Sequence, residues 1–212
     1  MIVVIGSAHL VLADGERSAG GLAVDIARAA AGDGSRVEFI ARIGDDPAGD
    51  DLLVALSRLR IGHVATLRDA SRPTLVTVVL DDVDGSAEPE PSTGAAAPDA
   101  GHALEREDVG LALRYITDFG VVVAVHVAPD VILEVAEAAG WASAHLVVVG
   151  RSGDDAPATI PSDALVIVDD SDEGESAVGA AIGRYAAAVE RGDDPAAAYA
   201  SILVAGTSAT GG

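Results

Sequence analysis

The stretch of sequence that decides the fold spans residues 20–56 and reads GGLAVDIARAAAGDGSRVEFIARIGDDPAGDDLLVAL. A pair of glycines precedes an Ala-rich helical run, and Asp25 lies one turn into that run, between Val24 and Ile26. Glycines before a helix let a ligand approach backbone N–H groups, whereas an acid on the first turn also suits the helix dipole. From these residues alone, a tight turn followed by a dipole-friendly acid explains Asp25 better than a ligand does.

Runs rich in Val and Ile alternate with Ala-rich runs along the chain. The first kind predicts strands at residues 2–5, 37–43, 63–67, 74–80, 121–127, 145–150, 164–168 and 201–206, with 63–67 and 74–80 as neighbours. The second kind predicts helices near residues 21–31, 48–59, 130–139 and 173–190. Several strands are apolar on both faces, as buried parallel strands are. The pattern predicts a three-layer α/β fold with a mainly parallel sheet covered by helices on both faces.

Residues 82–103 interrupt this alternation with the sequence DVDGSAEPEPSTGAAAPDAGHA. Their Pro, Gly, Ala and acidic residues predict a flexible loop. Because the strand and helix pattern runs on both sides of this loop, we expect a single domain over residues 1–212. Ligands of open α/β sheets bind beyond the carboxyl ends of the strands. We therefore expect any site near the loops that follow residues 6, 44, 127, 150 and 168.

The charge of the chain is strongly negative. Thirty-four acidic residues face 13 basic ones, which gives a net charge of −21, and every basic side chain is Arg. Such a surface repels nucleic acid and anionic lipid, so we expect neither as a partner. Salt at 1 M shortens the Debye length to about 3 Å and would screen this repulsion. The composition predicts a protein of a halophile; a GC-rich genome is the alternative, which explains the missing Lys better than the shortage of Arg.

Other features of the composition exclude several classes of protein. The chain has no Cys, so it has neither disulfides nor thiolate metal sites. No apolar run approaches the roughly 20 residues of a membrane span. The start MIVVIG reads as a strand and not as a signal peptide, so we expect a cytoplasmic protein. Neither a GxGxxG after the first strand nor a GxxxxGK[ST] loop occurs.

The spacing within residues 20–56 resembles the amino-terminal signature of the PfkB carbohydrate kinases, the ribokinase-like family. Asp25 occupies the Asn position of that signature, and a G-x-D-x-x-G pattern with a Leu-rich helix follows it. The matching small residues are Gly20, Gly21, Ala23, Ala27, Gly34 and Gly44. The resemblance implies a ribokinase-like αβα fold and ATP and Mg²⁺ as cofactors if kinase activity survives. It also implies a site for a sugar or nucleoside at His9, Gly20, Gly21, Asp25 and Gly44.

The resemblance extends along nearly the whole chain. The segment ALVIVDDSDEGESAVG looks like the part of the family that holds an N-x-x-E motif, which helps to organise magnesium and phosphate. Here the motif starts with Asp170 and ends with Glu173, so the resemblance implies these two as metal residues. A solvated acidic turn with helix capping is the alternative. The segment SILVAGTSATGG looks like the strand and Gly turn near the nucleotide in family members.

Three departures from the family bear on activity. The family's G-A-G-D motif, with its anion hole and catalytic base, is missing; one alignment ends at Gly212 before it, and another places DDSDEGE over it. The early sugar-binding Asp has no match, since Val11 stands near its place and His9 where Asn is usual. Only the 13 residues 7–19 lie between the first strand and the glycine pair, so we expect a lid that is reduced or absent.

Three hypotheses remain open. The first is a PfkB-like protein without phosphotransferase activity that binds a small sugar, polyol or nucleoside, or acts through a protein partner. The second is an active ATP- and Mg²⁺-dependent carbohydrate or nucleoside kinase with an atypical site, in which Asp25 or Asp170 supplies the base. The third is an interaction module that pairs through an apolar sheet face, as a homodimer.

Overall fold

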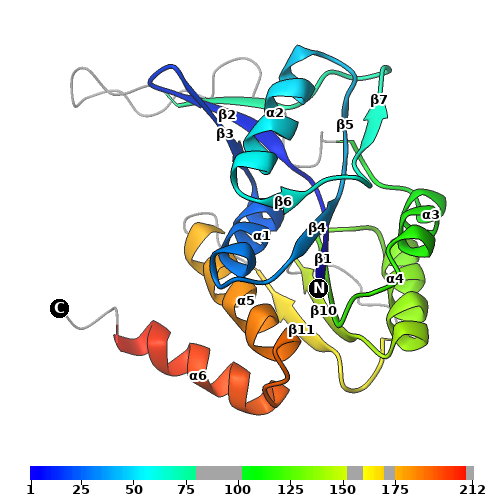
Figure 1. Cartoon of the computed structure of the whole chain (residues 1–212), viewed down its shortest axis with the longest axis vertical. Coiled ribbons are helices and arrows are strands. Elements are labelled where there is room, and N and C mark those ends of the chain that lie inside the picture. Colours follow the sequence, from blue (N-terminus) through cyan, green and yellow to red (C-terminus); the bar gives the residue numbers. More distant parts are fainter. Residues whose placement is uncertain (80–101, 152–159, 170–174, 209–212) are drawn as a thin grey trace.

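The computed structural model describes residues 1–79, 102–151, 160–169 and 175–208, without the side chains of 175–176 and 203–208. Most of the predicted loop at 82–103 lies outside these residues. The described helices, labelled in Figure 1, are α1 (Leu22–Gly32), α2 (Pro47–Arg58), α3 (Arg106–Tyr115), α4 (Pro129–Ala142), α5 (Glu175–Glu190) and α6 (Pro195–Ser208). The described strands are β1 (Ile2–Ile5), β2 (His9–Ala13), β3 (Glu16–Gly20), β4 (Val37–Ile40), β5 (Arg42–Gly44), β6 (Ile61–Gly62), β7 (Leu67–Asp69), β8 (Val76–Val79), β9 (Val121–Val125), β10 (His145–Gly150) and β11 (Leu165–Val168).

A parallel sheet with the strand order β11-β10-β9-β1-β4-β6 forms the centre of the molecule. Ile2 of β1 aligns with Val37 of β4 on one side and with Val121 of β9 on the other. Because β1 has a strand on either side, all four of its residues are buried. The prediction of an α/β fold with a mainly parallel sheet is confirmed.

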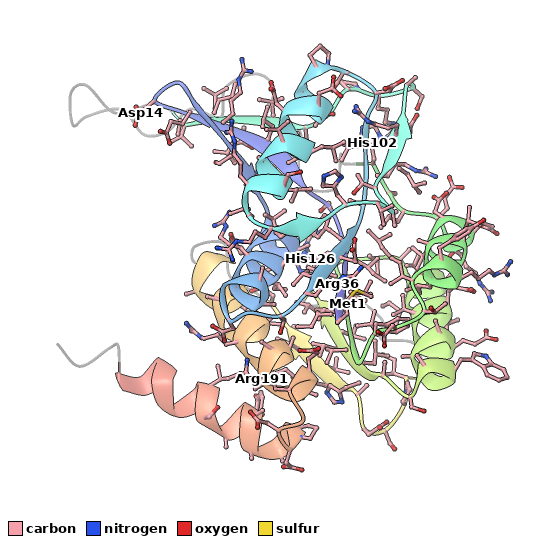
Figure 2. The ribbon with its side chains drawn as sticks, viewed as in Figure 1. Met1, Asp14, Arg36, His102, His126 and Arg191 are labelled. Atoms are coloured by element: carbon pink, nitrogen blue, oxygen red, sulfur yellow. The ribbon has the colours of Figure 1, made fainter. Side chains whose placement is uncertain are left out.

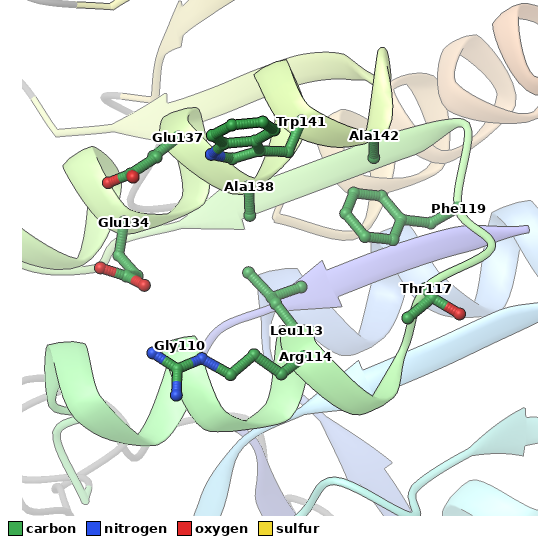
Figure 3. A pocket seen from close by; sticks show the side chains of 10 residues that line it. All are labelled: Gly110, Leu113, Arg114, Thr117, Phe119, Glu134, Glu137, Ala138, Trp141 and Ala142. Carbon is green, nitrogen blue, oxygen red and sulfur yellow. The ribbon is translucent and has the colours of Figure 1, made fainter.

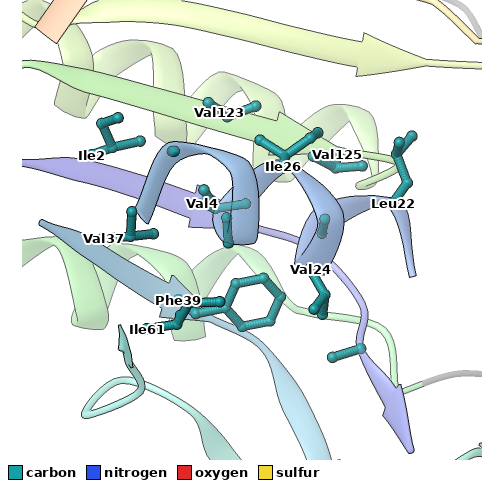
Figure 4. Close-up of a cluster of buried hydrophobic side chains, with 14 of the residues drawn as sticks. Ile2, Val4, Leu22, Val24, Ile26, Val37, Phe39, Ile61, Val123 and Val125 are labelled. Atoms are coloured by element: carbon teal, nitrogen blue, oxygen red, sulfur yellow. The ribbon is translucent and has the colours of Figure 1, made fainter. Parts of the chain in front are cut away.

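Side chains of the central strands point alternately to two hydrophobic cores, as the two-residue period of a strand requires. Ile2 and Val4 pack with α1 and α5 in one core, which Figure 4 shows with Phe39 among its labelled residues. Val3 and Ile5 pack on the opposite face with α3 and α4. Helices therefore cover both faces of the sheet, and the cores consist mainly of aliphatic side chains.

Two glycines of α5 allow it to pack closely on α1. A Cβ atom at Gly179 would lie 2.7 Å from the Cβ atom of Asp25, and one at Gly183 would lie 2.4 Å from the carbonyl oxygen of Ile26. Distances this short leave no room for any side chain. The two glycines lie four residues apart, so they occupy the same face of α5, and this face covers the first turns of α1.

A second, smaller sheet has the strand order β3-β2-β8. β2 and β3 form an antiparallel hairpin around Asp14 and Gly15, both with positive φ, and β8 pairs with β2 in parallel. Asp-Gly is a strong signal for a two-residue hairpin turn, and the sequence analysis did not use it. The segment at residues 7–19, which was expected to be too short for a full lid, therefore contributes most of a short hairpin. β5 and β7 form a separate parallel pair.

Several parts of the secondary structure differ from the prediction, and one is the strand expected at residues 63–67. Residues 63–66 are not a strand but a turn closed by a hydrogen bond from the amide of Thr66 to the carbonyl of His63, with Val64 exposed to solvent. The preceding Arg60 has a φ of 59°, which turns the chain out of the helix before β6. The strand expected next to it, β8, pairs instead with β2 in the smaller sheet.

The run SILVAG at 201–206, predicted as a strand, lies in helix α6. Pro195 stands in the first turn, the side chain of Asp194 accepts from the amide of Ala197 at 3.0 Å, and alanines follow. These helix signals outweigh the short β-branched run. Helix α3 was not predicted at all, although the amide of its N-cap Glu105 donates to Asp108 three residues on, as in a capping box.

No helix in the described parts of the chain is long and apolar enough to cross a membrane.

Candidate functional site

The chain leaves the central sheet at the carboxyl ends of β1 and β9. After β1, a side chain at Gly6 would lie 2.8 Å from the Cβ atom of Ala23 and 3.0 Å from the carbonyl oxygen of Val125, so only Gly lets α1 lie this close. After β9, His126 has a φ of 49°, and its amide donates to the carbonyl of Val149 at 2.9 Å; Figure 2 labels this residue. Both turns lie at the edge of the sheet where ligands of α/β proteins bind.

His9 covers the glycine pair that was singled out in the sequence. In the β2–β3 hairpin His9 lies directly across from Gly20. A Cβ atom at Gly20 would lie 2.8 Å from Nε2 of His9, and one at Gly21 would lie 3.4 Å from Nδ1. Gly21 has a φ of 111° and is the N-cap of α1 without a side-chain cap. The bare backbone thus provides the surface on which the imidazole ring lies.

Asp25 lies beside His9 and forms an ion pair with Arg28. Nη1 of Arg28 is 2.9 Å from Oδ1 of Asp25, and Nη2 of Arg28 donates to the carbonyl of Ala19 at 2.8 Å. Burial raises the pKa of Asp25, and the charges of Arg28 and His9 only partly offset this. Burial likewise lowers the pKa of His9, against the effect of Asp25. Sequence analysis missed Arg28, although an acid and an Arg three residues apart on one helix are a recognisable pair.

These groups have a defined hydrogen-bonding capacity. A charged Asp25 only accepts hydrogen bonds, and a neutral His9 carries one donor and one acceptor nitrogen. A ligand that contacts both therefore needs hydroxyl or amine donors as well as an acceptor. The structure brings four of the predicted site residues together: His9, Gly20, Gly21 and Asp25. Their role in binding stays a prediction.

Gly44, the fifth predicted site residue, lies in a clamp at the start of α2. A Cβ atom there would lie 2.4 Å from the amide nitrogen of Thr74 and 2.9 Å from the carbonyl oxygen of Arg72. Asp46 accepts from the amides of Gly49 and Thr74 and from the hydroxyl of Thr74, each at 2.8 Å. Burial opposes the charge of Asp46, but these hydrogen bonds outweigh it and lower its pKa. The atoms nearest Gly44 thus belong to a structural clamp.

The predicted metal residues Asp170 and Glu173 lie outside the described residues. Asp169, which precedes them, is buried at the end of β11, and its amide donates to the carbonyl of Gly150 at 2.9 Å. Within the described ranges, no group of three or more His, Cys, Asp or Glu side chains could hold a metal ion. The magnesium site therefore stays a prediction from the resemblance.

Two further histidines hold elements together. Nε2 of His145 lies 2.8 Å from the hydroxyl of Tyr185, which joins β10 to α5. Nδ1 of His102 lies 3.3 Å from Asp69 and Nε2 lies 3.1 Å from the carbonyl oxygen of Pro73. Figure 2 labels His102. These contacts give both histidines a structural role.

A groove between α3 and α4 encloses about 440 Å³ and is shown in Figure 3. Arg114 lies on its α3 side, Glu134 and Glu137 line its α4 side, and the indole of Trp141 is 85% exposed. Phe119 also lines the groove just before β9 begins. The groove therefore extends toward the amino ends of the strands, away from the edge where His126 lies.

Comparisons with known proteins agree with this fold. The description "pfkB family carbohydrate kinase" matches residues 5–211. Among solved structures, Sa239 is 16% identical with a TM-score of 0.64, and 93% of this chain and 89% of that chain are covered. Fructokinase from Xylella fastidiosa is 18% identical with a TM-score of 0.53, covering 95% and 68%. The PfkB protein from Polaromonas sp. JS666 is 17% identical with a TM-score of 0.54, covering 70% and 54%.

At such identities, the likeness to solved structures shows the fold alone. The chain spans 68% of the fructokinase and 54% of the Polaromonas protein, although it spans 89% of Sa239. No curated protein matches the sequence significantly.

Proposed function

Because the chain belongs to the PfkB family of carbohydrate kinases, we propose that it binds a small sugar, polyol or nucleoside at His9, Gly20, Gly21 and Asp25. We further propose that it does not catalyse ordinary phosphoryl transfer to this ligand. Gly44 stays part of the predicted site, although the atoms nearest to it belong to the clamp with Thr74.

One observation carries the binding proposal: the half-buried carboxylate of Asp25 stands at the Asn position of the family signature, beside His9 and the bare glycine pair. Ligand hydroxyls can donate to this carboxylate, and hydrogen bonds to a charged group contribute about 1.5–3 kcal/mol each. A carboxylate cannot donate as an Asn amide does, so the ligand must bring the donors itself. A polyhydroxylated molecule meets this requirement.

The sequence supports the loss of phosphoryl transfer. The 212 residues contain no G-A-G-D, the motif that supplies the family's base and anion hole. Phosphoryl transfer depends almost entirely on positioning and on electrostatic stabilisation of the transferred group. Loss of a general base alone lowers a rate by about 10²–10⁴-fold. Loss of the anion hole together with the base would remove most of the remaining acceleration.

Binding is tested with a panel of pentoses, hexoses, polyols and nucleosides in molar KCl. A ligand that binds only the folded state raises the melting temperature, which circular dichroism measures. We expect at least one member of the panel to stabilise the protein and to bind at least about tenfold more weakly to an Asp25→Ala variant. The matched control is Asp33→Asn at the exposed C-cap of the same helix, which should bind like the wild type. If no member of the panel binds, the binding proposal is wrong.

Activity is tested separately. The protein is incubated with ATP, Mg²⁺ and each member of the panel, and phosphorylated products are sought by mass spectrometry. We expect none. A product that disappears in the Asp25→Ala variant would overturn the proposal and establish the alternative, an active ATP- and Mg²⁺-dependent carbohydrate or nucleoside kinase with an atypical site.

A further inference from the structure

A second hollow lies between β3, α1 and α2, and arginines from all three elements line it. Arg17 lies on β3, Arg28 on α1 and Arg58 in the last turn of α2, around a cavity of about 300 Å³. The whole chain has 13 arginines against 34 acidic residues. Nearly a quarter of its positive side chains therefore meet at one small cavity of a molecule with a net charge of −21.

Two of these three charges are compensated. Nη1 of Arg17 lies 2.8 Å from Oδ2 of Asp51, and Nη1 of Arg28 lies 2.9 Å from Oδ1 of Asp25. For Arg58, no acidic partner is found among the residues that the structure describes. Its place at the carboxyl end of α2 suits a cation, but the helix dipole does not explain why two more arginines face the same hollow. One positive charge is left over for an anion.

The donors and the size of the cavity define the class of anion. A guanidinium presents five N–H groups in a planar fork that matches phosphate oxygens. Arg28 uses one N–H for Asp25 and one for the carbonyl of Ala19, so further donors remain. A volume of about 300 Å³ is at the lower end of ligand pockets, which run from about 300 to 1,000 Å³. The lining also includes the buried apolar Ala19 and Ala55, against which a short carbon chain can pack.

We propose that Arg17, Arg28 and Arg58 bind the phosphoryl group of a small phosphate ester. This arginine pocket lies beside the proposed sugar site, and Arg28 connects the two because it lines the pocket and also pairs with Asp25. An anion that draws on the donors of Arg28 weakens its hold on Asp25 and changes the charge that the sugar site presents. This coupling, unlike the arginine pocket itself, rests on the proposed function.

The pocket is tested with inorganic phosphate and with glycerol 3-phosphate, by isothermal titration calorimetry at fixed ionic strength with KCl as the balancing salt. The ionic strength is fixed because added salt screens the repulsion between the acidic residues and would change the measured affinity by itself. We expect saturable binding of one anion per chain and a loss of affinity of about tenfold in Arg58→Gln, since a charge-assisted hydrogen bond disappears. The matched control is Arg114→Gln, an exposed arginine in the last turn of α3, which should bind like the wild type.

Two outcomes would overturn the proposal. The first is no saturable heat with either anion. The second is equal affinity of Arg58→Gln and Arg114→Gln. An Arg17→Gln variant tests the affinity for the anion independently. Arg17 is exposed, so this substitution leaves the core intact. None of these measurements needs a sugar, so the arginine pocket and the proposed function can fail separately.

Discussion

Asp25 is held between two opposing influences. The cover that α5 and its Gly179 provide favours the neutral acid, whereas Arg28 and His9 favour the carboxylate, and the balance raises the pKa of Asp25. The folded protein therefore keeps a proton on this group at pH values where the unfolded chain has already released it. Folding stability falls as the pH rises from the unfolded pKa of Asp, about 3.9, through the raised folded value.

An Asp25→Asn variant removes this titration. We expect the free energy of unfolding of the variant, minus that of the wild type, to increase as the pH rises through that window. Above the window this difference should stay constant. Urea denaturation at a series of pH values, followed by circular dichroism, measures the difference. The exposed Asp33→Asn variant should show no such trend. A wild-type protein that gains stability over Asp25→Asn in this window would contradict the expected direction of the pKa shift.

Sequence reasoning located some residues of the site and not others. Gly20, Gly21 and Asp25 follow one spaced pattern, so the pattern could bring them together. His9 was placed with them by the same resemblance, although it stands where the family usually has Asn. Arg28 was missed although its spacing of three residues from Asp25 was a usable signal, whereas its contact with the backbone carbonyl of Ala19 leaves no trace in a sequence.

At the scale of elements, long periodic runs were predictable and short ones were not. The buried strands β1, β9 and β10 follow from their apolar runs because both faces of each strand are covered. The two-residue strand β6 and the turn after it have no such run, so the segment around residues 63–67 was misread. In the α6 segment a strand was predicted from the short run at residues 201–206. The alanines before this run and Pro195 in the first turn favour the helix that forms there.

The contact between α1 and α5 depends on the absence of a side chain at Gly183. A Cβ atom there would lie 2.4 Å from the carbonyl oxygen of Ile26 and 2.6 Å from the Cβ atom of Ala29. We expect Gly183→Ala to lower the free energy of unfolding by about 1–3 kcal/mol, as overpacking does. Gly140→Ala in α4 is the matched control, because its Cβ atom would meet nothing within 4 Å. It should stabilise by about 0.5–1 kcal/mol through helix propensity.

Urea denaturation followed by circular dichroism compares the two glycine variants with the wild type. If Gly183→Ala proved as stable as Gly140→Ala, the two helices would not pack as closely as described.

At the scale of the whole molecule, composition predicts behaviour that the fold does not. The parallel sheet and its helices follow from alternation and from the family signature, and both would exist at any net charge. The excess of acids, 34 against 13 basic residues, gives a net charge of −21, and like charges repel one another across a small protein. Whether this reflects a halophile or only a GC-rich genome depends on how the folded state responds to salt.

We propose the halophile interpretation and expect the melting temperature to rise between low salt and molar KCl. The physical reason is screening, since the Debye length falls from about 30 Å at 0.01 M to about 3 Å at 1 M. Thermal unfolding followed by circular dichroism measures the change, and sucrose at equal osmolality controls for effects that do not depend on charge. An unchanged melting temperature in KCl would favour codon bias instead.

The groove between α3 and α4 has an optical consequence. Trp141 is the only tryptophan of the chain, and it lines that groove while 85% of its surface stays exposed to solvent. Its emission in the folded state therefore resembles that of free indole, and melting of the cores leaves the spectrum nearly unchanged. The same residue becomes a selective reporter for any molecule that shields the groove from solvent, since a blue shift can then arise only there.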